Sequence, residues 1–204
     1  CVALEDLGSL AAVGGWFNEV FLYDLESGSL LRTHSASGQT YDLLILPDHP
    51  TVVAGKVGRV VVWRDGSTPV AEFEAVTADY TGLAWGSSGL LASDLGNRKL
   101  VNLAYRSFPL QDRGGVAGSE LWALESDPTG KRVFIGSSDG RLHRFDLATS
   151  QLETRAGHTQ GVTSIAMVGS RVATASDDKT IALWDPEKLE VVARSKAHEY
   201  LVNY

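Results

Sequence analysis

Residues 162–196 read VTSIAMVGSRVATASDDKTIALWDPEKLEVVARSK, and this stretch decides the fold class. Four short apolar runs alternate here with turn signals that contain Gly, Asp or Pro. No run keeps a 3.6-residue apolar period over the length of a helix, so the stretch predicts four antiparallel strands joined by short turns. The predicted strands are Val162–Val168, Arg171–Ser176, Thr180–Asp185 and Glu190–Lys196.

The same pattern recurs along the whole chain. Within the third run of each unit, five aligned residues (20–24, 60–64, 100–104, 142–146 and 181–185) carry a large apolar residue at their fourth position: Tyr23, Trp63, Leu103, Phe145 and Trp184. These positions are 40, 40, 42 and 39 residues apart. A unit of about 40 residues with four antiparallel strands is typical of a β-propeller blade, whose sheet buries its faces by stacking on its neighbours. The sequence therefore predicts an all-β propeller with five recognisable four-stranded blades.

The last unit resembles a WD40 repeat. Ala156-Gly157-His158 matches the Gly-His start of that family, and Trp184-Asp185 matches its Trp-Asp end. The other units keep the period without the full set of residues. The resemblance implies a structural tetrad in the fifth unit, four side chains joined by hydrogen bonds inside the blade: His158, Thr174 (or Ser176 on the same strand face), Asp178 and Trp184.

The period sets the blade boundaries at approximately 1–36, 37–76, 77–117, 118–157 and 158–197. Residues 198–204 then restart the pattern and predict the first strand of a further blade. Because a closed five-bladed ring would leave that strand unpaired, we expect the chain to be part of a larger propeller. The missing blades would come from further sequence or from a partner chain. The alternative is a five-bladed ring with one free terminal strand.

The composition excludes several function classes. The 204 residues are 44% hydrophobic and 21% charged, with a net charge of −7 at pH 7. That acidic balance argues against nucleic acid as a partner, because phosphates need a basic face. No apolar run approaches the roughly 20 residues that cross a bilayer, so we expect no membrane insertion. The single cysteine, Cys1, excludes an internal disulfide, and we expect a reducing, cytoplasmic location.

Surface recognition is the function that remains. In a propeller, the turns before the innermost strand and between the second and third strands gather on one rim, and such loops carry function. Aromatic and charged residues there have no core to fill and supply binding energy at interfaces. The candidate binding residues are Trp16, Phe17, Lys56, Arg98, Arg113 and Asp177. Arg113 is expected to begin a glycine-rich connection, Arg113–Ser119, after an outer strand at Phe108–Asp112.

Patterns for catalysis or metal binding are weak. Gly136-Ser137-Ser138-Asp139-Gly140 matches the Gly-x-Ser-x-Gly elbow of hydrolases, but a predicted strand follows it where the elbow requires a helix. No histidine pair has metal-ligand spacing, and His34, His49 and His143 show no ligand pattern. We therefore expect no cofactor and no metal, and a non-catalytic scaffold that binds a protein or peptide, alone or within a multi-subunit complex. The alternative is an enzyme with its active site at the channel mouth.

Overall fold

The computed structural model describes residues 1–5, 8–35, 38–46, 51–64, 68–74, 79–103, 111–116 and 118–196. Every helix or strand element within these ranges is a β-strand, and the strands form five four-stranded antiparallel sheets. The predicted all-β class and its four-stranded units are confirmed. The predicted start of a further blade, residues 198–204, lies outside the described residues.

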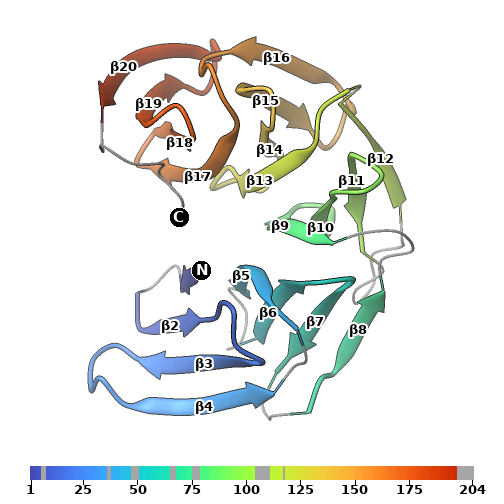
Figure 1. The fold of residues 1–204 in the computed structure, drawn as a ribbon, viewed down its shortest axis with the longest axis vertical. Helices are drawn as coiled ribbons and strands as arrows, with labels where there is room; N and C mark the ends of the chain where they lie inside the picture. Colours follow the sequence, from blue (N-terminus) through green and yellow to red (C-terminus); the bar gives the residue numbers. More distant parts are fainter. Residues whose placement is uncertain are drawn as a thin grey trace. The chain divides into compact units, whose positions relative to one another are not determined.

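The chain divides into two compact units, residues 1–83 and 84–204, and each is described by itself. In every sheet the strand order follows the sequence, so that each strand pairs with the next one along the chain (Figure 1). The first unit contains β1 (Val2–Leu4), β2 (Leu10–Val13), β3 (Glu19–Asp24), β4 (Leu30–Ser35), β5 (Thr40–Leu46), β6 (Thr51–Lys56), β7 (Arg59–Trp63) and β8 (Ala71–Glu74).

The second unit holds the remaining sheets, except that β9 crosses the division. Its first sheet is β9 (Tyr80–Gly86), β10 (Gly89–Asp94), β11 (Lys99–Asn102) and β12 (Gln111–Gly115). The next is β13 (Leu121–Ser126), β14 (Arg132–Ser137), β15 (Arg141–Asp146) and β16 (Leu152–Ala156). The last is β17 (Val162–Val168), β18 (Arg171–Ser176), β19 (Thr180–Asp185) and β20 (Glu190–Lys196).

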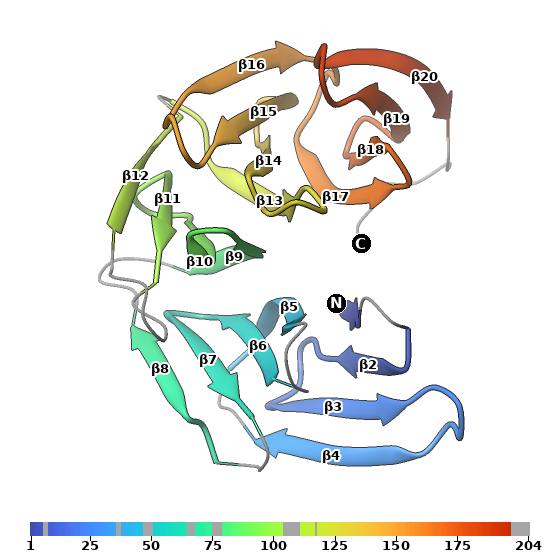
Figure 2. The same cartoon turned by 180° about the vertical axis from the view of Figure 1, so that it is seen from behind.

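Successive sheets within a unit pack through apolar side chains, because one four-stranded sheet cannot bury both of its faces alone. In the first unit, Ala12 and Leu22 of one sheet share a core with Val52 and Trp63 of the next. In the second unit, Phe134 of β14 packs with Trp184 of β19 in the same way. The first strands of neighbouring sheets are in contact, as for β1 with β5 and β13 with β17 (Figure 2).

Glycines in the second strands allow these close approaches. A Cβ atom at Gly136 would lie 2.6 Å from Val162 Cγ1, on the first strand of the next sheet. A Cβ atom at Gly55 would lie 2.9 Å from the Tyr80 carbonyl oxygen of β9. Both glycines pair with the residue three positions before the large apolar residue of the third strand. In the last sheet, Ala175 occupies this register position.

Candidate interaction surface

Two turns meet one connecting segment at an edge of the first unit, which we call the turn edge. The β2–β3 turn, residues 14–18, reaches the segment before β5 because the Gly38 amide donates to Asn18 Oδ1 at 3.0 Å. The β6–β7 turn reaches the same segment through the Val57 amide, which donates to the Gln39 carbonyl at 3.3 Å. One bond to a side chain and one backbone bond therefore tie both turns to the same connecting segment.

The turn edge exposes large apolar side chains. Trp16 is 85% exposed and Phe17 is 58% exposed, and both lie in the β2–β3 turn. Val57, in the β6–β7 turn, is 47% exposed. A Cβ atom at Gly38 would lie 3.8 Å from Val57 Cβ, so the connecting segment packs directly against this valine. Exposed aromatic clusters of this kind mark contact surfaces on soluble proteins.

Lys56, which the sequence placed among the binding residues, is buried beneath the turn edge instead. It ends β6, and its Nζ donates to Thr40 Oγ1 at 2.9 Å. Burial, together with the nearby charge of Arg59, lowers the pKa of Lys56 to about 8. The prediction of a surface role for Lys56 is wrong, because the β6–β7 turn is only two residues long and the lysine belongs to the strand.

Two aspartates tie the β9 segment to the sheet before it within the first unit. Asp79 accepts from the Gly58 amide and from the Tyr41 hydroxyl, each at 3.0 Å. Asp42 accepts from the Leu83 amide at 2.7 Å. Burial raises the pKa of Asp42 to about 7, although its N–H donors oppose the shift. Sequence reasoning did not single out either residue, because a lone aspartate carries no pattern.

The other predicted binding residues lie in the second unit. Arg98 is exposed in the β10–β11 turn, with a φ of 56° in the left-handed region. Asp177 is half-buried in the β18–β19 turn, where its amide donates to the Gly161 carbonyl at 3.0 Å. Arg113 lies within β12 and donates to Asn102 Oδ1 at 3.3 Å, so the predicted loop position of Arg113 is wrong.

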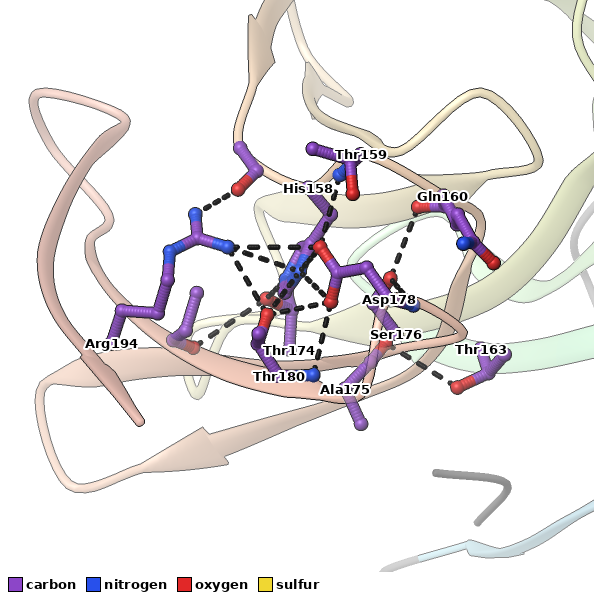
Figure 3. Close-up of polar contacts among 12 residues, drawn as sticks. His158, Thr159, Gln160, Thr163, Thr174, Ala175, Ser176, Asp178, Thr180 and Arg194 are labelled. Carbon is purple, nitrogen blue, oxygen red and sulfur yellow. Dashed lines mark hydrogen bonds and ion pairs between the residues drawn. The ribbon is translucent and has the colours of Figure 1, made fainter. Parts of the chain in front are cut away.

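The four tetrad residues are brought together by hydrogen bonds, and Figure 3 shows three of them, His158, Thr174 and Asp178. Trp184 Nε1 donates to Thr174 Oγ1 at 2.8 Å, and His158 Nε2 lies 2.7 Å from the same oxygen. His158 Nδ1 lies 3.1 Å from Asp178 Oδ2. Because the carboxylate needs a donor, Nδ1 carries the imidazole proton and Nε2 accepts the hydroxyl proton of Thr174. Every polar atom in this chain of contacts therefore has a partner.

Arg194 and Thr180 extend this network beyond the predicted four residues. The Thr180 hydroxyl donates to Asp178 Oδ1 at 2.6 Å, and Arg194 Nη1 lies 3.8 Å from Asp178 Oδ2. Burial alone would raise the pKa of Asp178. The hydrogen bonds from Thr180 and from the Thr159 amide outweigh burial and hold the pKa of Asp178 well below its ordinary range. Burial lowers the pKa of His158, in keeping with a neutral ring.

A second buried histidine network lies in the preceding sheet, and sequence reasoning missed it. His143 Nε2 lies 2.8 Å from Ser137 Oγ, and Nδ1 lies 2.8 Å from Thr154 Oγ1. The Ser137 hydroxyl lies 2.6 Å from Asp139 Oδ1, to which it donates its proton. Nε2 of His143 must then be a donor to Ser137. Burial lowers the pKa of His143 to about 4.

This network accounts for the Gly-x-Ser-x-Gly sequence without catalysis at Ser137. The Ser137 side chain is fully buried, and its proton faces Asp139 while His143 donates to it, so His143 is not placed to act as its base. Both glycines have packing roles, because Gly136 admits Val162 and a Cβ atom at Gly140 would lie 2.5 Å from the His158 carbonyl oxygen.

His34 is placed differently from the histidine of the tetrad. It lies on β4 and stacks on Trp63 of β7, with ring centroids 5.2 Å apart and an interplanar angle of 27°. Both rings are fully buried. Among the residues that the structure describes, none is a hydrogen-bond partner of Trp63 Nε1. The register explains this, since Ala54 in β6 stands where Thr174 stands in β18.

Within the residues that the structure describes, no group of three or more His, Cys, Asp or Glu side chains could hold a metal ion. In the same part of the chain, no helix has the length and apolar character needed to cross a membrane.

Comparison with known proteins identifies relatives of the chain. Residues 149–185 match the family described as WD domain, G-beta repeat. The chain is 25% identical over 186 residues to the WD repeat-containing protein SL1-17 of Schistosoma mansoni, covering 90% of this chain and 49% of that protein. It is 33% identical over 95 residues to mitogen-activated protein kinase kinase kinase A of Dictyostelium discoideum, covering 45% of this chain and 10% of that protein.

The chain thus spans about half the length of the first relative and a tenth of the second. The matched range 149–185 contains the tetrad from His158 to Trp184. Residues 149–185 thus match a WD repeat, and most of the sequence is similar to a WD repeat-containing protein.

Proposed function

We propose that this chain is a non-catalytic scaffold that binds a protein or peptide partner through Trp16, Phe17 and Val57 at the turn edge. The observation that carries the proposal is the 85% exposure of Trp16 beside an exposed Phe17. A tryptophan buries a large apolar area when a partner covers it, and tryptophan is enriched among the residues that dominate binding energy.

The turn that carries these aromatic residues is held in place before any partner arrives. The Thr40 amide donates to the Gly15 carbonyl at 2.8 Å, and the Gly38 amide donates to Asn18. A surface that is already ordered loses less conformational entropy on binding, which favours affinity. The match of residues 149–185 to a WD repeat supports a scaffold role by analogy. The exposed residues of the turn edge support the choice of this surface as the binding site.

An enzyme with an active site among the predicted rim residues is the less favoured function. Such a site would need acidic or histidine groups that converge on a substrate. The two histidine networks of the second unit are buried and bonded internally, with His143 fully buried and His158 bonded to Thr174 and Asp178. Asp79 is occupied by the Gly58 amide and the Tyr41 hydroxyl. These groups have structural partners that account for them.

The test is partner capture by the double variant Trp16→Ala/Phe17→Ala in the full-length protein. We expect loss of capture with an unchanged thermal transition, because both side chains are exposed in the structure. The matched control is Leu30→Ala/Leu31→Ala, which removes a second exposed apolar pair from β4 of the same sheet. Retained capture by the aromatic variant, or equal loss in the control, would disprove the proposed surface.

A further inference from the structure

The whole net charge of the chain resides in the first unit. Residues 1–83 contain 11 Asp and Glu against 4 Lys and Arg, a net charge of −7. Residues 84–204 contain 14 acidic and 14 basic residues, a net charge of 0. The unit that exposes Trp16 and Phe17 is therefore the acidic one, and its field attracts cations.

The few cations of the first unit are engaged within it. Lys56 is buried and donates to Thr40, and Arg59 Nη1 pairs with Glu72 Oε2 at 3.2 Å. Arg32 Nη1 donates to the Arg64 carbonyl at 3.2 Å. Lys56 and Arg59 flank the β6–β7 turn, but Lys56 is buried and Arg59 is paired with Glu72.

Carboxylates flank the exposed apolar residues of the turn edge. Glu19 is exposed and begins β3, directly after the turn that holds Trp16 and Phe17. Asp79 accepts from the Gly58 amide, next to Val57. Among the residues that the structure describes, neither carboxylate has a Lys or Arg partner.

Acidic residues of the second unit are arranged differently, since many of them are paired. Glu153 pairs with Arg144 at 2.5 Å, Asp185 with Arg171 at 2.6 Å, and Glu187 with Arg132 at 2.5 Å. Among the described residues, Glu19 and Asp79 thus lack the Lys or Arg partner that these carboxylates have. They place negative charge beside the exposed apolar residues of the turn edge.

We propose that the segment bound at the turn edge is a cationic peptide segment of a partner protein, with Lys or Arg side chains around one apolar residue. This inference rests on the proposed function and adds the chemistry of the partner. The apolar residue packs against Phe17 and Val57, and a Lys or Arg cation lies over the exposed face of Trp16, the best aromatic acceptor for such a contact. Glu19 and Asp79 receive the remaining positive charge.

The test uses a displayed library of random 12-residue peptides, selected on the full-length protein and counter-selected on the Trp16→Ala/Phe17→Ala variant. We expect the enriched peptides to carry a positive net charge with at least two Lys or Arg residues and one large apolar residue. Enrichment of neutral or acidic peptides that still need Trp16 and Phe17 would overturn this inference and leave the proposed function intact. Enrichment that is independent of both aromatic residues would overturn both.

A second measurement isolates the negative charge beside the apolar residues of the turn edge. For the best-enriched peptide, Glu19→Gln should weaken binding by about threefold to fivefold, because a partly exposed ion pair contributes modestly. Glu26→Gln, an exposed carboxylate in the β3–β4 turn, is the matched control and should change binding by much less. Raising the salt concentration should weaken peptide binding to the native protein more than peptide binding to the Glu19→Gln variant. Equal effects of the two substitutions would contradict the assignment of Glu19.

Discussion

The sheets β17–β20 and β5–β8 each bury a tryptophan side chain, but the surroundings of the indole N–H differ between the two sheets. Trp184 and Trp63 are each the fifth residue of the third strand of their sheet, and both are almost completely buried. The indole N–H of Trp184 donates to Thr174, whereas the indole N–H of Trp63 has no partner within the described ranges of the chain. The comparison teaches that packing places the indole and that the hydrogen bond is a separate addition.

The sheet β13–β16 provides a third arrangement. Phe145 stands in the tryptophan position, and Ile135 stands in the register position of Thr174. Loss of the indole donor is thus accompanied by loss of the hydroxyl acceptor. The buried polar chain of this sheet runs instead through Ser137, His143 and Thr154. In this sheet the donor and the acceptor are lost together, whereas in β5–β8 the hydroxyl is lost and the buried indole N–H of Trp63 remains, dehydrated without compensation.

The largest expected effect is that of Thr174→Val, which makes the last sheet resemble β5–β8. The substitution keeps the shape but leaves the Trp184 N–H and His158 Nε2 without their shared partner. We expect a loss of about 2–4 kcal/mol in the free energy of unfolding. Hydrogen exchange of the backbone amides in β17–β20 measures the loss of stability in this sheet. Thr174→Ser keeps the hydroxyl and is the control; if both variants lose the same stability, the hydroxyl is not responsible.

The next largest expected effect is on the pH dependence of stability, which should differ between the two units. The pKa of His143 is lowered to about 4 in the folded state, so the unfolded chain binds more protons between pH 6.5 and 4. Stability around His143 should therefore fall as the pH falls through that window, by up to about 3 kcal/mol. Asp42 has a raised pKa of about 7, so its contribution should increase as the pH falls from 7 towards 4.

Hydrogen exchange at pH 7 and pH 5 measures both slopes in one protein. His143→Gln and Asp42→Asn should each flatten the slope of its own unit only. After correction for the intrinsic pH dependence of amide exchange, protection around β13–β16 that does not decrease on acidification would show that His143 titrates near its ordinary pKa.

The smallest expected effect is that of Ala54→Ser, which supplies a hydroxyl where β5–β8 has none. Ala54 pairs with Val61 as Thr174 pairs with Ala182, so the new oxygen would lie near Trp63 Nε1. A neutral hydrogen bond adds about 0.5–1.5 kcal/mol, reduced by the extra atom in a packed core. Equilibrium unfolding compares Ala54→Ser, which adds an oxygen, with Ala54→Cys, which adds a larger sulfur that is a weaker hydrogen-bond acceptor. Equal stability of these variants would contradict the role of the acceptor.

Sequence reasoning succeeds where the local pattern and the fold agree. The four strands predicted between Val162 and Lys196 have the same bounds in the structure, because apolar runs and turn residues alternate cleanly there. The prediction for Arg113-Gly114-Gly115 is wrong because glycine disfavours strands locally, whereas pairing with β11 places these residues in β12. Burial of Lys56 was missed because lysine is almost never fully buried without a partner such as Thr40.

The polar network around His143 could not be predicted for a related reason. Its partner Thr154 lies on the next strand, and the contact depends on the register between β15 and β16. The sequence alone does not identify Thr154 as the partner of His143, because it does not give the register between these two strands. The exposure of Trp16 and Phe17 is more accessible to sequence reasoning, because both lie in a turn that the repeat pattern already identifies.

The glycines of the second strands make the repeats unequal as building blocks. Gly136 accepts Val162 of the following repeat at a distance that no other residue permits, and Gly55 does the same for the backbone at Tyr80. A duplicated or transplanted repeat therefore stacks correctly only after a repeat whose second strand offers matching room. Recombination among these repeats is constrained by the identity of one residue in the second strand. The order of the repeats along the chain therefore affects how they pack.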